Sequence, residues 1–408
     1  MAMRDKQIIV IGAGPSGLMA AIFAARRGAK VQILERMNKP GRKLLLTGNG
    51  RCNMTNLDSS LPSRYCSDEP EAAERMISRV LCAFSATDTI AFFEKLGVAV
   101  YDRDGYVYPH SGQAESVLNA LLHECGRLGV RIRCDTQVLK LEKDKTGQWN
   151  VCTTGWTYRA DAVILCAGSK AAPETGSDGS GYTILQNLGH SIISPVPALT
   201  ALTVSDGCPV TAAGDRCRAA AALQVDGITR AVETGELQWI KDGISGVAVF
   251  SLSRHATRAL QQGRKVSVML DLAPGYDMND LCRLISFRAQ AWPEENGIFL
   301  LQGIVPSRTA KYITQRFGEI KDIQVLTKLL KSLPLTITGS RDFPQAQTCA
   351  GGISLTEVEQ DSLCSTIHKG LYFAGEILDI DGPCGGYNLQ WAFASGAAAG
   401  RAASNAAG

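Results

Sequence analysis

Three glycines near the start of the sequence have the spacing that binds a dinucleotide. Gly12, Gly14 and Gly17 form a GxGxxG motif. Its first glycine permits a tight turn, its second lets the backbone approach a pyrophosphate, and its third lets a helix pack closely on a strand. Glu35 stands eighteen residues past Gly17, where a carboxylate can accept hydrogen bonds from ribose hydroxyls. This acid favours a ribose with a free 2′-hydroxyl, so the motif predicts FAD or NAD rather than NADP and does not separate the first two.

A second group of residues has side chains suited to proton transfer. Tyr106-Val-Tyr108-Pro-His110-Ser111 is the densest local cluster of proton donors, and tyrosine and histidine both serve as general acids. We weigh Tyr108 and His110 as catalytic acids against a cap or solvated-loop role, which is the commoner role of a histidine just ahead of a helix. For Asp379 and Asp381, turn formation or cofactor binding is favoured over acid–base work.

Arg51, Cys52 and Asn53 lie in a glycine-rich loop. Arg51 suits contact with a pyrophosphate, and it also suits a substrate anion or a structural role. Cys52 would need a second cysteine to form a redox pair, and no other cysteine lies within ten residues of it. We therefore expect cofactor contacts from this loop rather than thiol chemistry.

The remaining histidines and cysteines argue against two other kinds of site. His123, His190, His255 and His368 share no metal-ligand spacing, so we predict no metal. The thirteen cysteines form no CxxC pair, which argues against a zinc ribbon, a thioredoxin-like pair and a disulfide framework. Reduced thiols of this kind are typical of a cytoplasmic protein.

The elements around the glycine motif are those that its chemistry requires. Gln7–Ile11 is a short apolar strand, Gly14–Arg27 has helical spacing, and Val31–Leu34 is a second strand. This βαβ unit places the glycine turn at a helix N-terminus, whose free N–H groups and positive dipole suit phosphates. Further helical patterns cover about Glu71–Leu96 and Ala114–Gly129.

The pattern of the sequence changes around Ser194-Pro-Val-Pro197. Short strands and turns follow to about Leu272, and a helical region runs from Asp277 to about Leu333. From Leu371 the chain returns to a strand, a glycine-rich turn and an alanine-rich helix. Because this last segment carries a second nucleotide-type signal and is too short to fold alone, we predict a Rossmann domain assembled from both ends of the chain and interrupted by an inserted domain.

Composition argues against several other classes of protein. The 408 residues are 45% hydrophobic and 20% charged, with a formal net charge of +3, so nothing points to nucleic acid or an anionic membrane surface. No apolar run reaches the ~18 residues that a membrane span needs. The start of the chain leads straight into a strand, so we expect no signal peptide and no membrane span.

Four further segments resemble parts of known flavoproteins. Asp161–Ser169 resembles the second FAD motif of two-dinucleotide-type flavoproteins, and Gly176–Tyr182 resembles the loop that follows it in fumarate reductase and steroid dehydrogenase flavoproteins. Gly370–Glu376 resembles the final FAD motif, whose acid binds the ribityl chain. Gly385–Gln390 would begin the helix whose N-terminal amides face the flavin pyrimidine edge, where a helix dipole stabilises the negative charge of reduced flavin.

Three stretches narrow the resemblance to one family. They are Gly41–Asn56, Gln347–Ile353 and Asp379–Ala392, and the GRCNxTN and GGYNLQWA segments within them are highly specific. Together they closely resemble the BaiN/YhiN-type FAD-dependent oxidoreductases, over nearly the whole chain. Other branches of that family carry a Phe-Thr-His triplet where this chain has Trp239-Ile240-Lys241, so a role assigned to that histidine does not transfer.

The resemblance implies a fold and its division into domains. The fold is α/β, with a two-dinucleotide-type Rossmann FAD-binding domain interrupted by an inserted β-barrel and a helical subdomain. We expect the FAD-binding domain at 1–193 and 346–408, the barrel at 194–275 and 334–345, and the helical subdomain at 276–333.

The expected site residues lie in the glycine motif, the Arg51 loop and the later flavoprotein motifs. The expected FAD contacts are Gly12, Ala13, Gly14, Pro15, Ser16, Gly17, Glu35, Arg36, Lys43, Arg51, Cys52, Asn53, Val138, Ala167, Gly168, Gly375, Glu376, Gly386, Asn388 and Leu389. The expected catalytic residues are Tyr108, His110 and Arg51.

The resemblance also implies a reaction: hydride transfer from flavin N5 to a conjugated carbon–carbon double bond of a hydrophobic 3-oxo steroid- or bile-acid-like enone. NAD(P)H is the expected electron donor. Because no second GxGxxG occurs in a βαβ context, it must bind transiently at the flavin face. Three alternatives stay open: an amine or aminoketone oxidase, a flavin-dependent RNA-modifying or RNA-associated protein, and a flavin-binding sensor without turnover. The near-neutral charge and the lack of a basic aromatic patch speak against RNA.

Overall fold

The chain folds around two separate hydrophobic cores. The computed structural model describes residues 6–205, 209–293 and 297–405. Unit 1 consists of Met1–Pro195 and Thr348–Gly408, and unit 2 is Val196–Gln347. Unit 2 is therefore an insertion into unit 1, which is assembled from both ends of the chain.

Unit 1 is built on a parallel sheet whose strands also come from both ends of the chain. The strand order is β19-β10-β1-β2-β6, and neighbouring strands run parallel. The strands are β1 (Gln7–Ile11), β2 (Lys30–Leu34), β6 (Arg131–Arg133), β10 (Ala162–Leu165) and β19 (Leu371–Phe373). Val163 pairs with Leu371, so the C-terminal segment extends the sheet that the N-terminal βαβ unit begins. The central strands β1 and β10 are nearly continuous apolar runs because a parallel sheet is covered on both faces.

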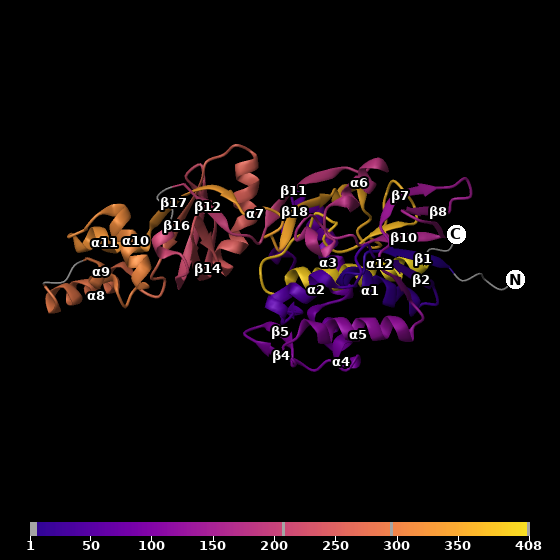
Figure 1. The fold of residues 1–408 in the computed structure, drawn as a ribbon, viewed down its shortest axis with the longest axis horizontal. Helices are drawn as coiled ribbons and strands as arrows, with labels where there is room; N and C mark the ends of the chain where they lie inside the picture. Colours follow the sequence, from indigo (N-terminus) through magenta and orange to yellow (C-terminus); the bar gives the residue numbers. More distant parts are fainter. Residues whose placement is uncertain (1–5, 206–208, 294–296, 406–408) are drawn as a thin grey trace. The chain divides into compact units, whose positions relative to one another are not determined.

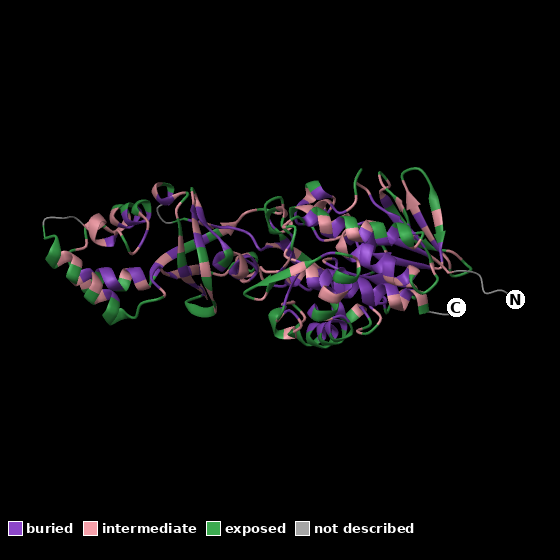
Figure 2. Ribbon diagram, turned by 90° about the horizontal axis from the view of Figure 1, so that it is seen from below, coloured by how far each residue is buried: buried purple, intermediate pink, exposed green. Residues whose placement is uncertain are grey.

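Two helices from opposite ends of the chain, α1 (Pro15–Ala25) and α12 (Tyr387–Asn405), pack side by side (Figure 1). A Cβ at Gly396 would lie 2.3 Å from the Ser16 carbonyl oxygen, and one at Gly400 would lie 2.3 Å from that of Ala20. Only glycine permits this close approach of the two backbones. Buried residues concentrate in these two helices and in the sheet (Figure 2).

Further helices complete unit 1: α2 (Arg42–Leu46), α3 (Pro70–Ala83), α4 (Ala86–Lys95), α5 (Ala114–Arg127) and α6 (Ser180–Asn187). The helical pattern at Glu71–Leu96 folds as two helices because Ser85 starts a new one, in a reciprocal capping box with Asp88. Among the described residues, one stretch is long and apolar enough by composition to cross a membrane, Pro70–Lys95. It comprises α3 and α4, and half of its apolar window is buried, as in core helices.

Two smaller sheets also belong to the described part of unit 1, one with the order β3-β5-β4 and one with the order β7-β8-β9. A further sheet pairs β18 with β11, the strand along which the chain passes from unit 1 into unit 2. Their bounds are β3 (Thr55–Asn56), β4 (Val100–Arg103), β5 (Tyr106–Pro109), β7 (Val138–Lys143), β8 (Trp149–Thr153), β9 (Thr157–Ala160), β11 (Ile192–Ala198) and β18 (Thr348–Ile353).

Unit 2 combines a closed barrel with helices. The barrel has the order β12-β15-β14-β13-β16-β17, with β12 (Leu202–Val204), β13 (Arg216–Val225), β14 (Ile228–Ile240), β15 (Gly243–Ser245), β16 (Val266–Asp271) and β17 (Leu333–Ser340). The helices are α7 (Val247–Gln261), α8 (Met278–Ala291), α9 (Gly297–Leu301), α10 (Ser307–Phe317) and α11 (Ile323–Lys331). The predicted architecture, a Rossmann-type α/β domain interrupted by a β-barrel and a helical subdomain, is confirmed.

Candidate functional site

The turn between β1 and α1 shows a different reason for each of its three glycines. Gly12 has a φ of +99°, and a Cβ there would lie 2.4 Å from the Cys166 carbonyl oxygen. A Cβ at Gly17 would lie 1.9 Å from the Gly12 carbonyl oxygen. Around Gly14, in contrast, no heavy atom lies within 4 Å of the position of a Cβ. The protein itself therefore requires the first and third glycines, and the second borders open space at an α1 N-terminus that no side chain caps.

Glu35 is held beside this turn at the end of β2. Its carboxylate accepts two backbone hydrogen bonds, from Ala13 N to Oε2 at 2.7 Å and from Met37 N to Oε1 at 2.8 Å. The residue is buried. Because a carboxylate has about four lone-pair sites, each oxygen keeps capacity for one more donor. The geometry thus presents an oriented acceptor pair next to the glycine turn.

The loop before α6 contacts the two residues that follow Glu35. Arg36 forms an ion pair with Asp178, and a Cβ at Gly176 would lie 2.8 Å from Cγ of Met37. Burial raises the pKa of the Asp178 carboxyl, but hydrogen bonds from Arg36 and Ser180 outweigh it and hold the pKa below its usual range. The expected FAD contact Arg36 is therefore already engaged with a carboxylate.

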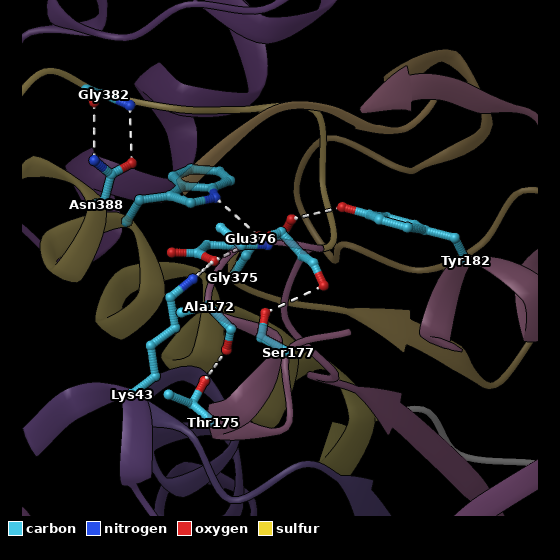
Figure 3. A network of polar contacts seen from close by, with 12 residues as sticks. Lys43, Ala172, Thr175, Ser177, Tyr182, Gly375, Glu376, Gly382 and Asn388 are labelled. Carbon is cyan, nitrogen blue, oxygen red and sulfur yellow. Dashed lines mark hydrogen bonds and ion pairs between the residues drawn. The ribbon is translucent and has the colours of Figure 1, made fainter. Parts of the chain in front are cut away.

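A polar cluster surrounds Glu376 at the end of the C-terminal strand motif (Figure 3). Its Oε2 accepts hydrogen bonds from Lys43 Nζ at 2.5 Å and from Ser169 Oγ at 2.9 Å. Its backbone carbonyl accepts one from the Tyr182 hydroxyl at 3.3 Å. Burial raises the pKa of the neighbouring Cys349 thiol, with Ser169 and the charge of Lys43 opposing the shift. The cluster joins α2, β18 and the two later motifs around one carboxylate.

At two other expected contacts, Gly168 and Gly375, neighbouring atoms lie so close that a side chain would not fit. A Cβ at Gly168, which has a φ of +75°, would lie 2.7 Å from Ser177 Oγ. One at Gly375 would lie 2.6 Å from Ser16 Oγ. The C-terminal motif therefore lies directly against the start of α1, and the structure brings the first and last motifs together.

The loop that leads into α12 is fixed by Asn388. Its side chain accepts a hydrogen bond from Gly382 N at 2.9 Å and donates one to the Gly382 carbonyl at 2.8 Å, as Figure 3 shows. A Cβ at Gly386 would lie 2.6 Å from the backbone of Thr55. Gln390 accepts hydrogen bonds at its Oε1 from the hydroxyls of Thr55 and Thr89. The polar side chains of this segment thus hold the start of α12 in place.

The Arg51 loop has an unusual backbone. Asn49 and Cys52 have φ values of 55° and 60°, in the left-handed region that non-glycine residues seldom adopt. Cys52 is fully buried, and burial raises the pKa of its thiol to about 12, so it stays protonated at neutral pH. Asn53 Oδ1 is buried and has no hydrogen-bond partner among the described residues. The loop therefore offers one buried acceptor that has no partner among the described residues.

The expected proton donors lie on the β4–β5 hairpin. Tyr108 is partly buried and its ring stacks on Tyr101, with centroids 5.7 Å apart. Burial raises the pKa of Tyr108, as do Tyr101 and Tyr106, while Arg103 and Arg51 lower it in part. Both guanidinium groups are therefore within electrostatic range of the Tyr108 hydroxyl, so the structure brings together two of the three expected catalytic residues.

His110, the third, is exposed at the end of β5. It meets Tyr101 edge to face, at 6.2 Å between ring centroids, and its backbone N–H donates to the Ala99 carbonyl at 2.8 Å. Of the other expected contacts, Val138 is buried at the start of β7, and Leu389 is partly buried in the first turn of α12.

A Ser–His–Glu arrangement also occurs in unit 1. His190 Nδ1 lies 2.9 Å from Glu357 Oε2, and His190 Nε2 lies 3.0 Å from Ser365 Oγ. Ser365 is buried, and its Oγ also accepts backbone hydrogen bonds from Ile367 and His368. A hydroxyl with no access to solvent and two amide donors is not a nucleophile, so this group stabilises the fold.

Sequence reasoning did not single out several residues of these clusters. Cys349 and Ser169 lie within motifs that were noted for other reasons, and only the fold brings them to Glu376. Tyr101 and Arg103 were also missed. The signal that could have found them is Asp104-Gly105, a typical two-residue hairpin turn, which sets the pairing of β4 with β5.

A glycine turn, an oriented acid after the second strand and a C-terminal strand–turn–helix motif in one parallel-sheet unit define the class of Rossmann-type flavoproteins. Residues 6–402 match the family model described as HI0933-like protein Rossmann domain. The chain belongs to this family, and the predicted BaiN/YhiN-type assignment is confirmed.

Comparison with characterised proteins gives relatives along nearly the whole chain. The chain is 39% identical to a 3-dehydro-bile acid delta(4,6)-reductase from Clostridium scindens, over 97% of this chain and 98% of that protein. It is 27% identical to a ribosomal RNA dihydrouridine synthase from Escherichia coli, over 95% of each chain. Among solved structures, a 3-ketosteroid delta1-dehydrogenase from Sterolibacterium denitrificans has a TM-score of 0.52 at 11% identity and covers 98% of this chain and 99% of its own. This last similarity concerns the fold alone.

The residues present fit FAD as the cofactor. Gly14 borders open space that a pyrophosphate can approach, Glu35 keeps acceptor capacity for ribose hydroxyls, and Asn53 Oδ1 is an unused buried acceptor. The family and the fold together identify the protein as an FAD-dependent oxidoreductase.

Proposed function

We propose that this protein reduces a carbon–carbon double bond conjugated to a ketone in a steroid- or bile-acid-like substrate. The observation that carries the proposal is the 39% identity to the 3-dehydro-bile acid delta(4,6)-reductase over nearly the full length of both proteins. When bound, FAD supplies the hydride for such a reduction. NAD(P)H is the proposed electron donor, and a cytoplasmic location agrees with the free thiols of the described cysteines.

In this proposal, residues of the β4–β5 hairpin donate the proton, and residues of the neighbouring loops stabilise the charge that develops on the substrate. The Tyr108 hydroxyl, whose pKa is raised, stays protonated at neutral pH and delivers a proton to the α-carbon of the substrate. Arg51, or a backbone amide near Gly385 and Gly386, stabilises the negative charge that develops on the substrate carbonyl oxygen. His110 is the second candidate acid, and its exposure makes it the weaker one.

A rapid-mixing experiment tests the proposal. Holoenzyme is reduced anaerobically and mixed with 3-oxo-Δ4 and Δ4,6 steroids, and the return of oxidised-flavin absorbance is followed. We expect reoxidation by at least one enone, at a rate that rises with enone concentration. If oxygen reoxidises the flavin but no enone does, while amines reduce the oxidised protein, the amine oxidase function replaces this one.

A second candidate is the reduction of a uracil ring in RNA. Relatives named ribosomal RNA dihydrouridine synthase, from Escherichia coli and Haemophilus influenzae, are 27% and 26% identical to this chain. Uracil also has a carbon–carbon double bond conjugated to a carbonyl group, so the same acid and anion-stabilising groups would serve. Reoxidation of the reduced holoenzyme by uridine-containing RNA, and by no steroid enone, would favour this candidate.

A further inference from the structure

The β4–β5 hairpin presents three tyrosines and an arginine on one face. The strand register pairs Tyr101 with Tyr108 and Arg103 with Tyr106. Side chains alternate along a strand, and directly paired residues point to the same side of the sheet. Tyr101, Arg103, Tyr106 and Tyr108 therefore share one face, which we call the tyrosine face. The exposed fractions of Tyr101 and Tyr106 are 41% and 36%, large for aromatic residues in a sheet.

The tyrosine face adjoins the segment that leads into α12. A Cβ at Gly385 would lie 2.5 Å from Cε1 of the Tyr106 ring, so this ring packs directly on the glycine. Asn56 Nδ2, on the neighbouring strand β3, donates to the Gly385 carbonyl at 3.3 Å. The tyrosine face is thus continuous with the Gly385–Gly386 turn, one of the groups to which the proposed function assigns charge stabilisation.

Two positive charges lie near this face. Arg103 and Arg51 both act electrostatically on Tyr108, and within the described ranges neither guanidinium group has an ion-pair or hydrogen-bond partner. Asp102 and Asp104 flank Arg103 in the sequence. Asp102 alternates to the opposite face, where it accepts a hydrogen bond from Gly105 N at 2.8 Å, and Asp104 lies in the turn beyond β4. Aromatic rings beside free guanidinium groups suit a ligand with a flat, largely apolar body and an anionic group.

We propose that the tyrosine face recognises the substrate, with Tyr101 and Tyr106 against its ring system and Arg103 paired with a carboxylate that the substrate carries. The inference rests on the proposed function and adds to it that the substrate is an acid. The face is a small basic aromatic patch that the pairing of β4 with β5 assembles. One free arginine beside the aromatic rings matches one carboxylate better than a polyanion, whose binding takes many phosphate contacts.

The test compares a 3-oxo-Δ4,6 bile acid with its neutral methyl ester. The variant is Arg103→Gln in the FAD-loaded protein, and the matched control is Arg131→Gln, which removes an exposed arginine from β6. We expect Arg103→Gln to raise the KM for the acid about fivefold and to change that for the ester less than about twofold, as for a partly exposed ion pair. Tyr101→Ala should raise both KM values by roughly tenfold, since it removes an aromatic contact.

Equilibrium binding separates a failure of this inference from a failure of the proposed function. The acid is titrated into oxidised holoenzyme and followed by the change in flavin absorbance, so no turnover is needed. Binding that Arg103→Gln weakens and Arg131→Gln does not supports the inference, even if no enone reoxidises the reduced protein. Equal changes for acid and ester, no change in Arg103→Gln, no binding of the acid, or tighter binding of oligouridylate than of the acid would each overturn it.

Discussion

The open space at Gly14 yields the sharpest prediction about the cofactor. In Gly14→Val, the new side chain enters a region where no protein atom lies within 4 Å of Cβ. The φ of −76° and ψ of −178° at this position are extended values that valine adopts without strain. Valine is a poorer helix N-cap than glycine, so we expect the free energy of unfolding of the FAD-free protein to fall by no more than about 1 kcal/mol.

The expected effect on FAD binding is far larger. The valine methyl groups would occupy the space through which a pyrophosphate reaches the N-terminal amides of α1. Loss of two hydrogen bonds to a charged group corresponds to about 3–6 kcal/mol, or roughly a 100- to 10,000-fold weaker affinity. The purified variant should therefore be colourless. FAD released by denaturation gives the occupancy, and thermal unfolding of FAD-free protein gives the stability.

Gly12→Val is the matched control, because there the clash is with the protein itself. At Gly12 the backbone has a φ of +99° and a Cβ would lie 2.4 Å from the Cys166 carbonyl oxygen. We expect this variant to lose stability by several kcal/mol, from backbone strain and steric overlap, and to lose FAD as a consequence. Full FAD occupancy in Gly14→Val, or a stability loss as large as that of Gly12→Val, would refute the assignment of this space to the pyrophosphate.

Three further predictions concern an acid, a hydroxyl and a histidine. Glu35→Gln should weaken FAD binding about tenfold, because a carboxylate is the stronger acceptor for ribose hydroxyls; a fluorescence titration that shows unchanged affinity would contradict this. Tyr108→Phe should slow enone-driven reoxidation about 100-fold and leave flavin reduction by NAD(P)H within about twofold; equal slowing of both half-reactions would exclude a proton-donor role. Burial lowers the pKa of His190 below its usual value of 6.5, with Glu357 partly opposing the shift. The folded state therefore binds the proton less readily than the unfolded state, so stability from this group is complete above about pH 6.5 and falls as the pH drops below it. Urea denaturation at pH 7.5 and 5.5 should show a smaller pH effect in His190→Gln, and an equal effect would count against the assignment.

The sequence predicts those parts of the site that depend on residues close to one another in the chain. Gly12 has a positive φ of +99° in the turn, and Gly17 faces the Gly12 carbonyl within the same strand–turn–helix segment, so their spacing identifies them. The Ser169–Glu376 hydrogen bond joins residues 207 positions apart, and no local pattern encodes it. Arg103 becomes notable only through its pairing with Tyr106 across β4 and β5. The register of such a pair is set by the turn and by the hydrophobic pattern of both strands, rather than by either residue alone.

The C-terminal motif shows that residues typical of a family need not contact a ligand with their side chains. The Asn388 side chain is occupied by Gly382, with which it exchanges two hydrogen bonds. Gln390 is fully buried and satisfied, because its Nε2 donates to the Phe84 carbonyl at 2.9 Å while its Oε1 accepts two hydroxyl bonds. Such side chains have little capacity left for a cofactor. They fix the start of α12, and a helix leaves the backbone N–H groups of its first turn unpaired. We therefore expect these backbone groups, rather than the side chains of Asn388 and Gln390, to face the negative charge of the reduced cofactor.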